Sequence, residues 1–261
     1  MRGPVIRRHF ELIWLLTRDM LRKEFAGSVL GIWWVVLKPV LLVGIYSLVV
    51  MSVFKPSPES GLTHTGYLLL VLSGMGPWLL MAESVSAAAG SIAANTPLLT
   101  KVLFPIEVLP ASRVVAAAVS GAAAVLLLIA WLAVDGRLGF WATAVPVVMV
   151  LQMIFALGIG WFVAAVAVTF PDVTHALPFG LNLWMLLSPV LYSPAMVPPG
   201  WSWLAHVNPM WPTIAVYRSL LLDNAAPDPV HLAVMGGWAA ASVLIGYTVF
   251  MKRRTMFEEL I

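Results

Sequence analysis

Long, unbroken apolar runs are the feature that most restricts how this chain can fold. Six of them approach or exceed the roughly 20 residues that a helix needs to cross a bilayer core of about 30 Å. They cover residues 32–54, 67–89, 112–134, 141–169, 176–197 and 230–251. The runs are continuously apolar rather than alternating, which excludes a transmembrane barrel. The sequence therefore predicts an all-α integral membrane protein with six transmembrane helices.

Composition excludes most other classes of protein. Hydrophobic residues make up 61% of the 261 residues and charged residues only 10%, whereas an ordinary soluble domain carries about 25% charged residues. A soluble domain of this size could not bury so much apolar surface. A disordered tail, a nucleic-acid-binding module and a secreted disulfide scaffold are excluded as well. Because the chain contains no cysteine, it has no disulfide, thiolate metal site or cysteine nucleophile.

The placement of lysine and arginine orients the predicted helices, because these residues are enriched in cytoplasmic connections. Of the 15 basic residues, only Lys55, Arg137 and Arg218 fall outside the regions that we assign to the cytoplasm. Both termini are therefore expected in the cytoplasm, as an even number of spans requires. No cleavable signal peptide is expected, because the charged N-terminal segment lacks a bounded apolar core. The N-terminal segment, the transmembrane domain and the cytoplasmic tail are predicted at residues 1–31, 32–251 and 252–261.

The N-terminal segment is predicted to contain an amphipathic helix over residues 9–25. Apolar residues that include Trp14 recur there at helical spacing, while Arg18 and Arg22 share another face and Asp19 lies between them in sequence. A helix with basic residues on one face and aromatic residues on another suits the lipid headgroup layer. The alternative is a solvated helix that only anchors the topology.

The second connection, residues 95–110, contains three prolines, which cannot sit inside a regular helix without breaking it. The piece between the first two prolines is long enough for about two helical turns and is apolar and basic. We expect this cytoplasmic piece to dock into another subunit, because exposed apolar side chains need a partner. The alternative is a loop packed on its own helices. The candidate docking residues are Leu98, Leu99, Lys101, Phe104 and Pro105.

The fifth connection, within residues 188–218, is rich in proline and tryptophan. The prolines divide it into short pieces, and the tryptophans are typical of a membrane interface. Irregular backbone at membrane depth must be buried in protein or line a water-filled cavity. We therefore expect short re-entrant helices that form a gate on the external face. The candidate gate residues are Pro189, Pro194, Trp201, Asn208 and Pro209.

The sequence lacks the motifs of an enzyme. No lysine follows a glycine, so the phosphate-binding motif G-x-x-x-x-G-K-[ST] cannot occur. The histidines are scattered and predict neither a metal site nor a catalytic triad. Glu83, within the second run, must be protonated, paired or near the interface, because a charge at the bilayer centre is costly. Lys38 most simply extends to the cytoplasmic headgroups.

At this point the chain resembles the membrane subunit of type-2 ATP-binding-cassette exporters, in the branch that exports bacterial cell-surface polysaccharides. The resemblance covers essentially the whole chain and rests on four blocks in order. One departure is Pro171, where the family often has arginine before the aspartate. The blocks are Thr17-Arg18-Asp19, Arg22, Phe25, Gly27-Ser28, Leu30-Gly31 and Trp33; Gly74, Pro77-Trp78, Asn95, Pro97-Leu98-Leu99, Lys101, Phe104-Pro105, Glu107 and Pro110; Phe170 and Asp172-Val173; and Ser188-Pro189-Val190, Tyr192, Asn208-Pro209 and Arg218.

The resemblance implies a permease in the bacterial inner membrane that moves a lipid-linked glycan of O-antigen, capsule or teichoic-acid type outward. It implies a homodimer with two separate ATPase subunits that hold the ATP and magnesium. It also implies that this chain contacts membrane lipids and does not bind nucleic acid. It also places the first and fifth spans at the pore. Trp34, Tyr46, Trp184 and Tyr192 then become candidates for the translocation path, because aromatic rings stack on sugar C–H faces; the alternative is that they anchor the helices in the headgroup region.

Two other classes of function stay open beside this one. Within transport, the alternative is a type-2 exporter of a small lipid, drug or haem. The alternatives that are not transporters are a scaffold protein and a membrane-embedded glycosyltransferase. A glycosyltransferase should have clustered acids or bases near an aqueous face, and this chain lacks them. A secondary carrier would show repeated spans or helices broken near mid-membrane around several polar groups.

Overall fold

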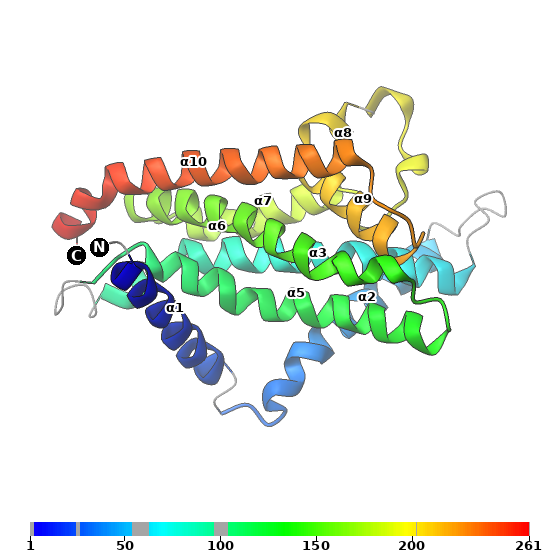
Figure 1. The fold of residues 1–261 in the computed structure, drawn as a ribbon, viewed down its shortest axis with the longest axis horizontal. Coiled ribbons are helices and arrows are strands. Elements are labelled where there is room, and N and C mark those ends of the chain that lie inside the picture. Colours follow the sequence, from blue (N-terminus) through cyan, green and yellow to red (C-terminus); the bar gives the residue numbers. More distant parts are fainter. Residues whose placement is uncertain (1–2, 25–26, 54–62, 97–103, 202, 261) are drawn as a thin grey trace.

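A computed structural model describes residues 3–24, 27–53, 63–96, 104–201 and 203–260, and these form helices, turns and loops without a strand. Figure 1 shows the helices gathered into one elongated bundle. In chain order the elements are α1 (Gly3–Glu24), η1 (Gly31–Trp33), α2 (Trp34–Val53), α3 (His64–Ala89), η3 (Ala93–Asn95), α5 (Val108–Val134), η4 (Phe140–Ala144), α6 (Val145–Thr169), α7 (Val173–Leu186), η5 (Pro194–Met196), η6 (Pro199–Trp201), α8 (Leu204–Val207), α9 (Met210–Leu221) and α10 (Pro229–Leu260).

Four helical segments in the described part of the chain are long and apolar enough to cross a membrane. They coincide with the second, third, fourth and sixth predicted runs, which confirms a multi-pass helical protein. The first run corresponds to α2, whose apolar part is shorter, and the fifth to α7, which has only 14 residues. Six spans therefore stay a prediction. The four segments are Thr65–Ala89, Val108–Val134, Phe140–Thr169 and Pro229–Arg254.

The fifth run was predicted as one helix over residues 176–197, and this boundary is wrong. Helix α7 ends at Leu186, and a tight turn follows. Pro189 has no backbone N–H and cannot continue the helical ladder, and the hydroxyl of Ser188 donates to the carbonyl of Trp184 at 2.7 Å just before it. Apolar composition continues beyond this point, but the helix does not.

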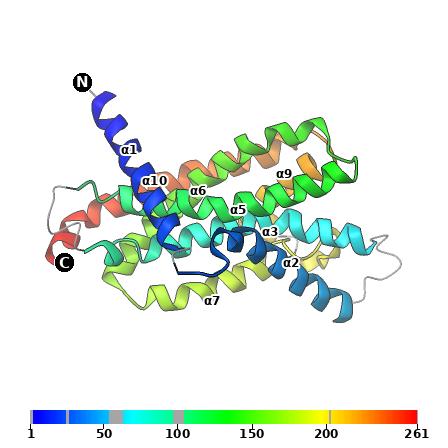
Figure 2. The ribbon, with the colours of Figure 1, turned by 90° about the horizontal axis from the view of Figure 1, so that it is seen from below.

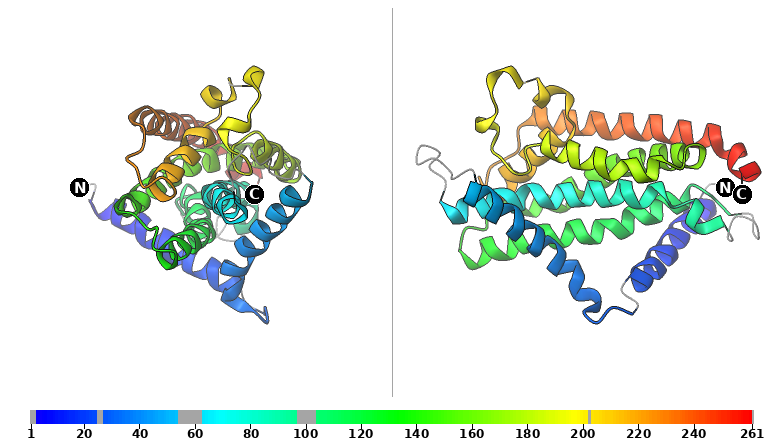
Figure 3. Two further views of the ribbon diagram at one scale, coloured as in Figure 1. Left: turned by 90° about the vertical axis from the view of Figure 1, so that its right-hand side faces the viewer. Right: turned by 180° about the vertical axis from the view of Figure 1, so that it is seen from behind.

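Helix α3 lies at the centre of the bundle, as the end view in Figure 3 shows, and its spanning segment is the most buried of the four. Small residues let its neighbours approach closely, as is common between membrane helices. A Cβ at Gly121 of α5 would overlap Leu80 of α3. A Cβ at Gly246 of α10 would overlap the carbonyl of Gly158 in α6. The pairs α3–α5 and α6–α10 are thus joined almost backbone to backbone.

The two chain ends lie at the same end of the bundle. In Figures 1 and 2 the start of α1 and the end of α10 lie at the same end of the bundle, on different sides of it, and in Figure 1 the segment with η5, η6 and α8 lies toward the opposite end. This arrangement agrees with the prediction that both termini face one side and the proline-rich connection the other. Helices α1 and α2 run obliquely and diverge from the bundle, as Figure 2 shows.

Helix α1 confirms the predicted N-terminal helix and begins earlier, at Gly3. It packs on the start of α5, where the hydroxyl of Thr17 donates to the carbonyl of Ser112 at 3.2 Å. Its aromatic side chains face outward, and Phe10 and Trp14 are 69% and 67% exposed. An outward aromatic face on a helix with basic residues is typical of the headgroup layer.

Candidate functional site

A cavity of about 980 Å³ lies among α1, α2, α3, η3 and α5. It lies near the end of the bundle that holds the chain termini, because Glu83 and Asn95 flank the end of α3 and Arg113 the start of α5. Its charged lining residues come from four helices that are distant in sequence. They are Asp19, Lys23, Lys38, Glu83 and Arg113.

An ion pair joins α2 to α3 across this cavity. The ammonium group of Lys38 donates a hydrogen bond to Oε1 of Glu83. The interpretation of Lys38 as a headgroup-seeking side chain is therefore wrong, because its charge is directed to a carboxylate of the neighbouring helix. The pair also explains how Glu83 is accommodated in an apolar run, since a charge in such a run requires a partner.

A second, smaller pocket of about 390 Å³ adjoins the cavity, and its exposed lining is almost entirely apolar. Leu21, Val35 and Val119 line both spaces. The smaller pocket is also bordered by Trp14, Arg18 and Arg22. Three of the four residues predicted on the interfacial helix thus lie at the apolar pocket, and the fourth, Asp19, lies at the polar cavity.

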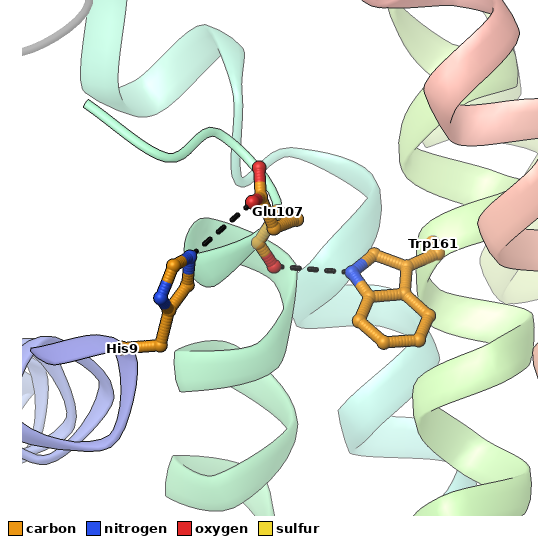
Figure 4. A network of polar contacts seen from close by, with 3 residues as sticks. All are labelled: His9, Glu107 and Trp161. Atoms are coloured by element: carbon orange, nitrogen blue, oxygen red, sulfur yellow. Dashed lines mark hydrogen bonds and ion pairs between the residues drawn. The ribbon is translucent and has the colours of Figure 1, made fainter. Parts of the chain in front are cut away.

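Glu107 connects the beginning of α5 to two other helices (Figure 4). Its Oε1 lies 3.4 Å from Nε2 of His9 in α1, and its backbone carbonyl accepts a 3.0 Å hydrogen bond from the indole of Trp161 in α6. Its Oε2 is buried without a hydrogen-bond partner among the described residues. Because Glu107 lies within the predicted docking connection, two residues after Pro105, that connection contacts both α1 and α6.

The docking residues themselves are only partly described. Leu98, Leu99 and Lys101 lie outside the described residues. Phe104 and Pro105 are half-buried, and the carbonyl of Pro105 accepts a 3.0 Å hydrogen bond from the amide of Val108. The predicted two-turn helix between the prolines also falls outside the described part.

The predicted gate region is organised around Arg218 of α9. Its guanidinium donates from Nη2 to the carbonyls of Pro189 at 2.6 Å and Leu70 at 3.3 Å. It also donates from Nη1 to the carbonyl of Tyr192 and from Nε to the hydroxyl of Ser73, both at 3.3 Å. These bonds attach the turn after α7 to the centre of α3. Hydrogen bonds from a charged donor are the stronger class, and the 2.6 Å bond to Pro189 is the shortest of these four.

Burial lowers the pKa of Arg218 to about 10, and the charge of Asp223 opposes that shift. The guanidinium therefore remains charged at neutral pH. Taking a charge out of water is tolerated only where its donors are satisfied. The surrounding carbonyls supply that satisfaction, so Arg218 and the turn depend on each other.

Asn208 forms the second polar centre of this region and is buried. Its side-chain oxygen accepts hydrogen bonds from the indole of Trp184 at 2.9 Å and from the amide of Met210 at 3.0 Å. Its side-chain nitrogen donates to the carbonyl of Leu187 and the hydroxyl of Ser188, both at 3.0 Å. Asn208 thus ties the end of α7 to the start of α9.

The other candidate gate residues occupy the short elements that follow α7. Pro189 is buried, Pro194 begins η5, and Pro209 precedes α9. Trp201 ends η6 and is 52% exposed. The structure therefore has short helices at the predicted connection, although α9, with 12 residues, is longer than expected.

The four candidate translocation residues have different surroundings. Trp34 at the start of α2 is exposed, and Tyr46 packs against the main hydrophobic core. Trp184 lies edge-on against Trp78, with ring centroids 6.1 Å apart. Tyr192 is half-buried, and its hydroxyl donates to the carbonyl of Leu186 at 3.3 Å. Helices α2 and α7 lie on the same flank of the bundle in Figures 2 and 3.

Sequence reasoning missed one buried amide in α6. Gln152 donates to the carbonyl of Pro77 at 2.6 Å and accepts from the hydroxyl of Tyr217 at 2.9 Å. Its amide thus joins α6 directly to the backbone of α3 at Pro77 and to the hydroxyl of Tyr217 in α9. An isolated glutamine in an apolar run was the signal, since such a residue needs a partner within the protein. The hydrogen bond between Ser73 and Arg218 and the position of Arg113 at the cavity had no comparable signal in the sequence.

No group of three candidate metal ligands occurs among the described side chains.

Comparison with known proteins places these features in a family. The ABC-2 type transporter family matches residues 11–222. An O-antigen export system permease protein RfbA of Klebsiella pneumoniae is 25% identical over 97% of this chain and 95% of its own length. A protein of the same description from Myxococcus xanthus is 29% identical over 95% of this chain and 94% of its own. The chain belongs to the ABC-2 type transporter family of membrane proteins.

Proposed function

We propose that this protein is the transmembrane subunit of an ATP-driven exporter that moves a lipid-linked polysaccharide of O-antigen type across the bacterial inner membrane. The observation that carries the proposal is the similarity to two O-antigen export permeases over nearly the full length of all three chains. Such coverage includes both the cavity and the gate region, so the likeness is not limited to one helix pair.

The energy source is expected on a separate ATPase, because this chain contains no P-loop. The connection at residues 95–110 is the proposed contact for that ATPase. The support for this contact is its position: Asn95, at the start of the connection, lines the cavity, and Glu107, within the connection, contacts α1 and α6. ATP and magnesium would be held by the ATPase and not by this chain.

The pore is proposed to form between two copies of this chain, with six spans in each and both termini in the cytoplasm. Exposed apolar residues on α7, such as Phe179 and Leu183, and on α2, such as Ile45 and Leu48, leave a flank that requires lipid or a second copy. The proposed path residues are Trp34 and Tyr46 on α2, Trp184 on α7, and Tyr192 in the segment that follows α7.

The decisive experiment is deletion of the gene followed by complementation, with surface polysaccharide measured at matched protein level. The wild-type chain, co-produced with its ATPase, should restore surface glycan, whereas an ATPase that cannot hydrolyse ATP should not. Alanine at all four path residues together should reduce export while the ATPase still co-purifies. Unchanged surface glycan in the deletion strain, with loss of resistance to a drug or of haem or lipid export instead, would favour the small-molecule alternative.

A further inference from the structure

We propose that Arg113 is the phosphate-binding residue of the cavity, and that the ligand is the phosphate-bearing headgroup of a lipid. This inference rests on the proposed function and deepens it, because it assigns the headgroup a specific cation within the chain. Three observations support it: the buried Nε of Arg113 without a hydrogen-bond partner among the described residues, the pairing of the other charges of the cavity, and the apolar pocket beside the cavity.

The first observation is that Arg113 has hydrogen-bonding capacity to spare. It lines the cavity, and its Nε is buried without a hydrogen-bond partner among the described residues. A buried donor without a partner costs free energy. A guanidinium presents five donors in a planar fork that matches phosphate oxygens. A phosphate in the cavity would satisfy the unpaired donor and supply the counter-charge.

The second observation is that the other charges of the cavity already have partners. Lys38 is paired with Glu83, and Lys23 lies 2.7 Å from Asp19 one helical turn away. Three cations and two anions therefore leave one net positive charge, and it resides on Arg113. Within a cavity bounded by apolar helices this charge acts over a longer range than it would in water.

The third observation indicates a lipid and not free phosphate. The apolar pocket of about 390 Å³ shares Leu21, Val35 and Val119 with the polar cavity. An amphiphile can place its headgroup in the cavity and the first part of its chain in the pocket. Inorganic phosphate would use only the polar half of this arrangement.

The test is equilibrium binding of radiolabelled dodecyl phosphate to the full chain, purified with its ATPase in a non-ionic detergent. Dodecanol serves as the uncharged probe and inorganic phosphate as the probe without a lipid chain. The variant R113Q removes the cation. The matched control is R137Q, because Arg137 lies exposed in the turn after α5 and outside the cavity lining.

We expect R113Q to bind dodecyl phosphate at least about tenfold more weakly than wild type, since a charge-assisted hydrogen bond accounts for about one such factor. Binding of dodecanol should not change, and R137Q should behave as wild type. The variant R113K keeps the charge and should retain an intermediate affinity. Inorganic phosphate should compete only weakly.

Three outcomes would overturn the assignment. Wild-type affinity of R113Q for dodecyl phosphate would remove Arg113 from the site. Equal binding of inorganic phosphate and dodecyl phosphate would remove the lipid. Loss of dodecanol binding in both R113K and R113Q would make Arg113 a structural residue. None of these outcomes depends on export. If R113Q exports normally and binds dodecyl phosphate as wild type does, this inference is wrong and the proposed function stands. If the wild-type chain binds dodecyl phosphate but exports no polysaccharide, the proposed function is wrong.

Discussion

Arg218 and Pro189 are joined by a 2.6 Å hydrogen bond from Nη2 of the guanidinium to the proline carbonyl. This bond attaches the turn after α7 to α9, and the bonds of Arg218 to Leu70 and Ser73 attach both to α3. The proline-rich region thus has a charged centre within the protein and is not a loose external loop.

Replacing Arg218 with leucine should destabilise the protein. The change removes the guanidinium donor from the buried carbonyl of Pro189 and from the carbonyl of Tyr192, and a buried acceptor left without a donor costs about 1–3 kcal/mol. We expect a lower thermal midpoint in detergent and reduced export. The conservative variant Arg218→Lys should recover part of the stability, and Arg137→Leu should have little effect because Arg137 is exposed. A wild-type midpoint for Arg218→Leu would contradict this role.

A methyl group at position 74 should disturb the same turn from the other side. A Cβ at Gly74 would lie 2.7 Å from the carbonyl oxygen of Val190 and 2.8 Å from its Cα, and backbone atoms at that distance must move. We expect Gly74→Ala to reduce export and thermal stability. The matched control is Gly44→Ala, where nothing lies within 4 Å of the added carbon. Similar behaviour of the two variants would show that the close approach is unimportant.

The Lys38–Glu83 pair should appear as an energetic coupling between α2 and α3. Lys38 is about half exposed, and solvent screening limits such a pair to roughly 0.5–1 kcal/mol. Lys38→Met and Glu83→Gln should each lower the thermal midpoint, and the double variant should lose less than the sum of the two. Strict additivity in this double-mutant cycle would mean that the pair contributes nothing measurable.

The connection at residues 95–110 should bind the ATPase through apolar contacts. Leu99→Asp and Phe104→Asp should each weaken co-purification of the ATPase while the chain still inserts into the membrane, because a carboxylate in an apolar contact costs desolvation energy. The control is Leu138→Asp, an exposed position in the loop after α5. Undiminished co-purification with both docking variants would place the ATPase contact elsewhere on the chain.

A single cysteine should report which side of the membrane the proline-rich region faces. The chain has no cysteine of its own, and Gly200 in η6 is exposed with no atom within 4 Å of an added Cβ. Gly200→Cys should react with an impermeant thiol reagent added outside intact cells whose outer membrane has been permeabilised. Asp172→Cys, at an exposed position between α6 and α7, should react only after the inner membrane is opened. The reverse pattern would invert the topology.

Sequence alone was sufficient for features that depend on local pattern. Four apolar runs coincide with long helices, and the periodicity of the N-terminal segment corresponds to α1. The fifth run was misjudged because apolarity continues past Pro189, and a buried turn is as apolar as a helix. The partners of Lys38 and Arg218 could not be foreseen, because they come from segments that only the tertiary fold brings together.

The contact between Gly158 and Gly246 has a mechanical consequence. Because the two backbones touch there with no Cβ on either glycine, sliding one helix along the other would bring a larger neighbouring side chain into the contact. Packed interfaces of this kind shift as discrete units and do not deform continuously. We therefore expect α6 and α10 to move as one rigid unit. We expect rearrangement during a transport cycle to fall instead on α1, α2 and the turn after α7, which polar contacts such as Thr17–Ser112, Lys38–Glu83 and Arg218–Pro189 join to the rest of the bundle.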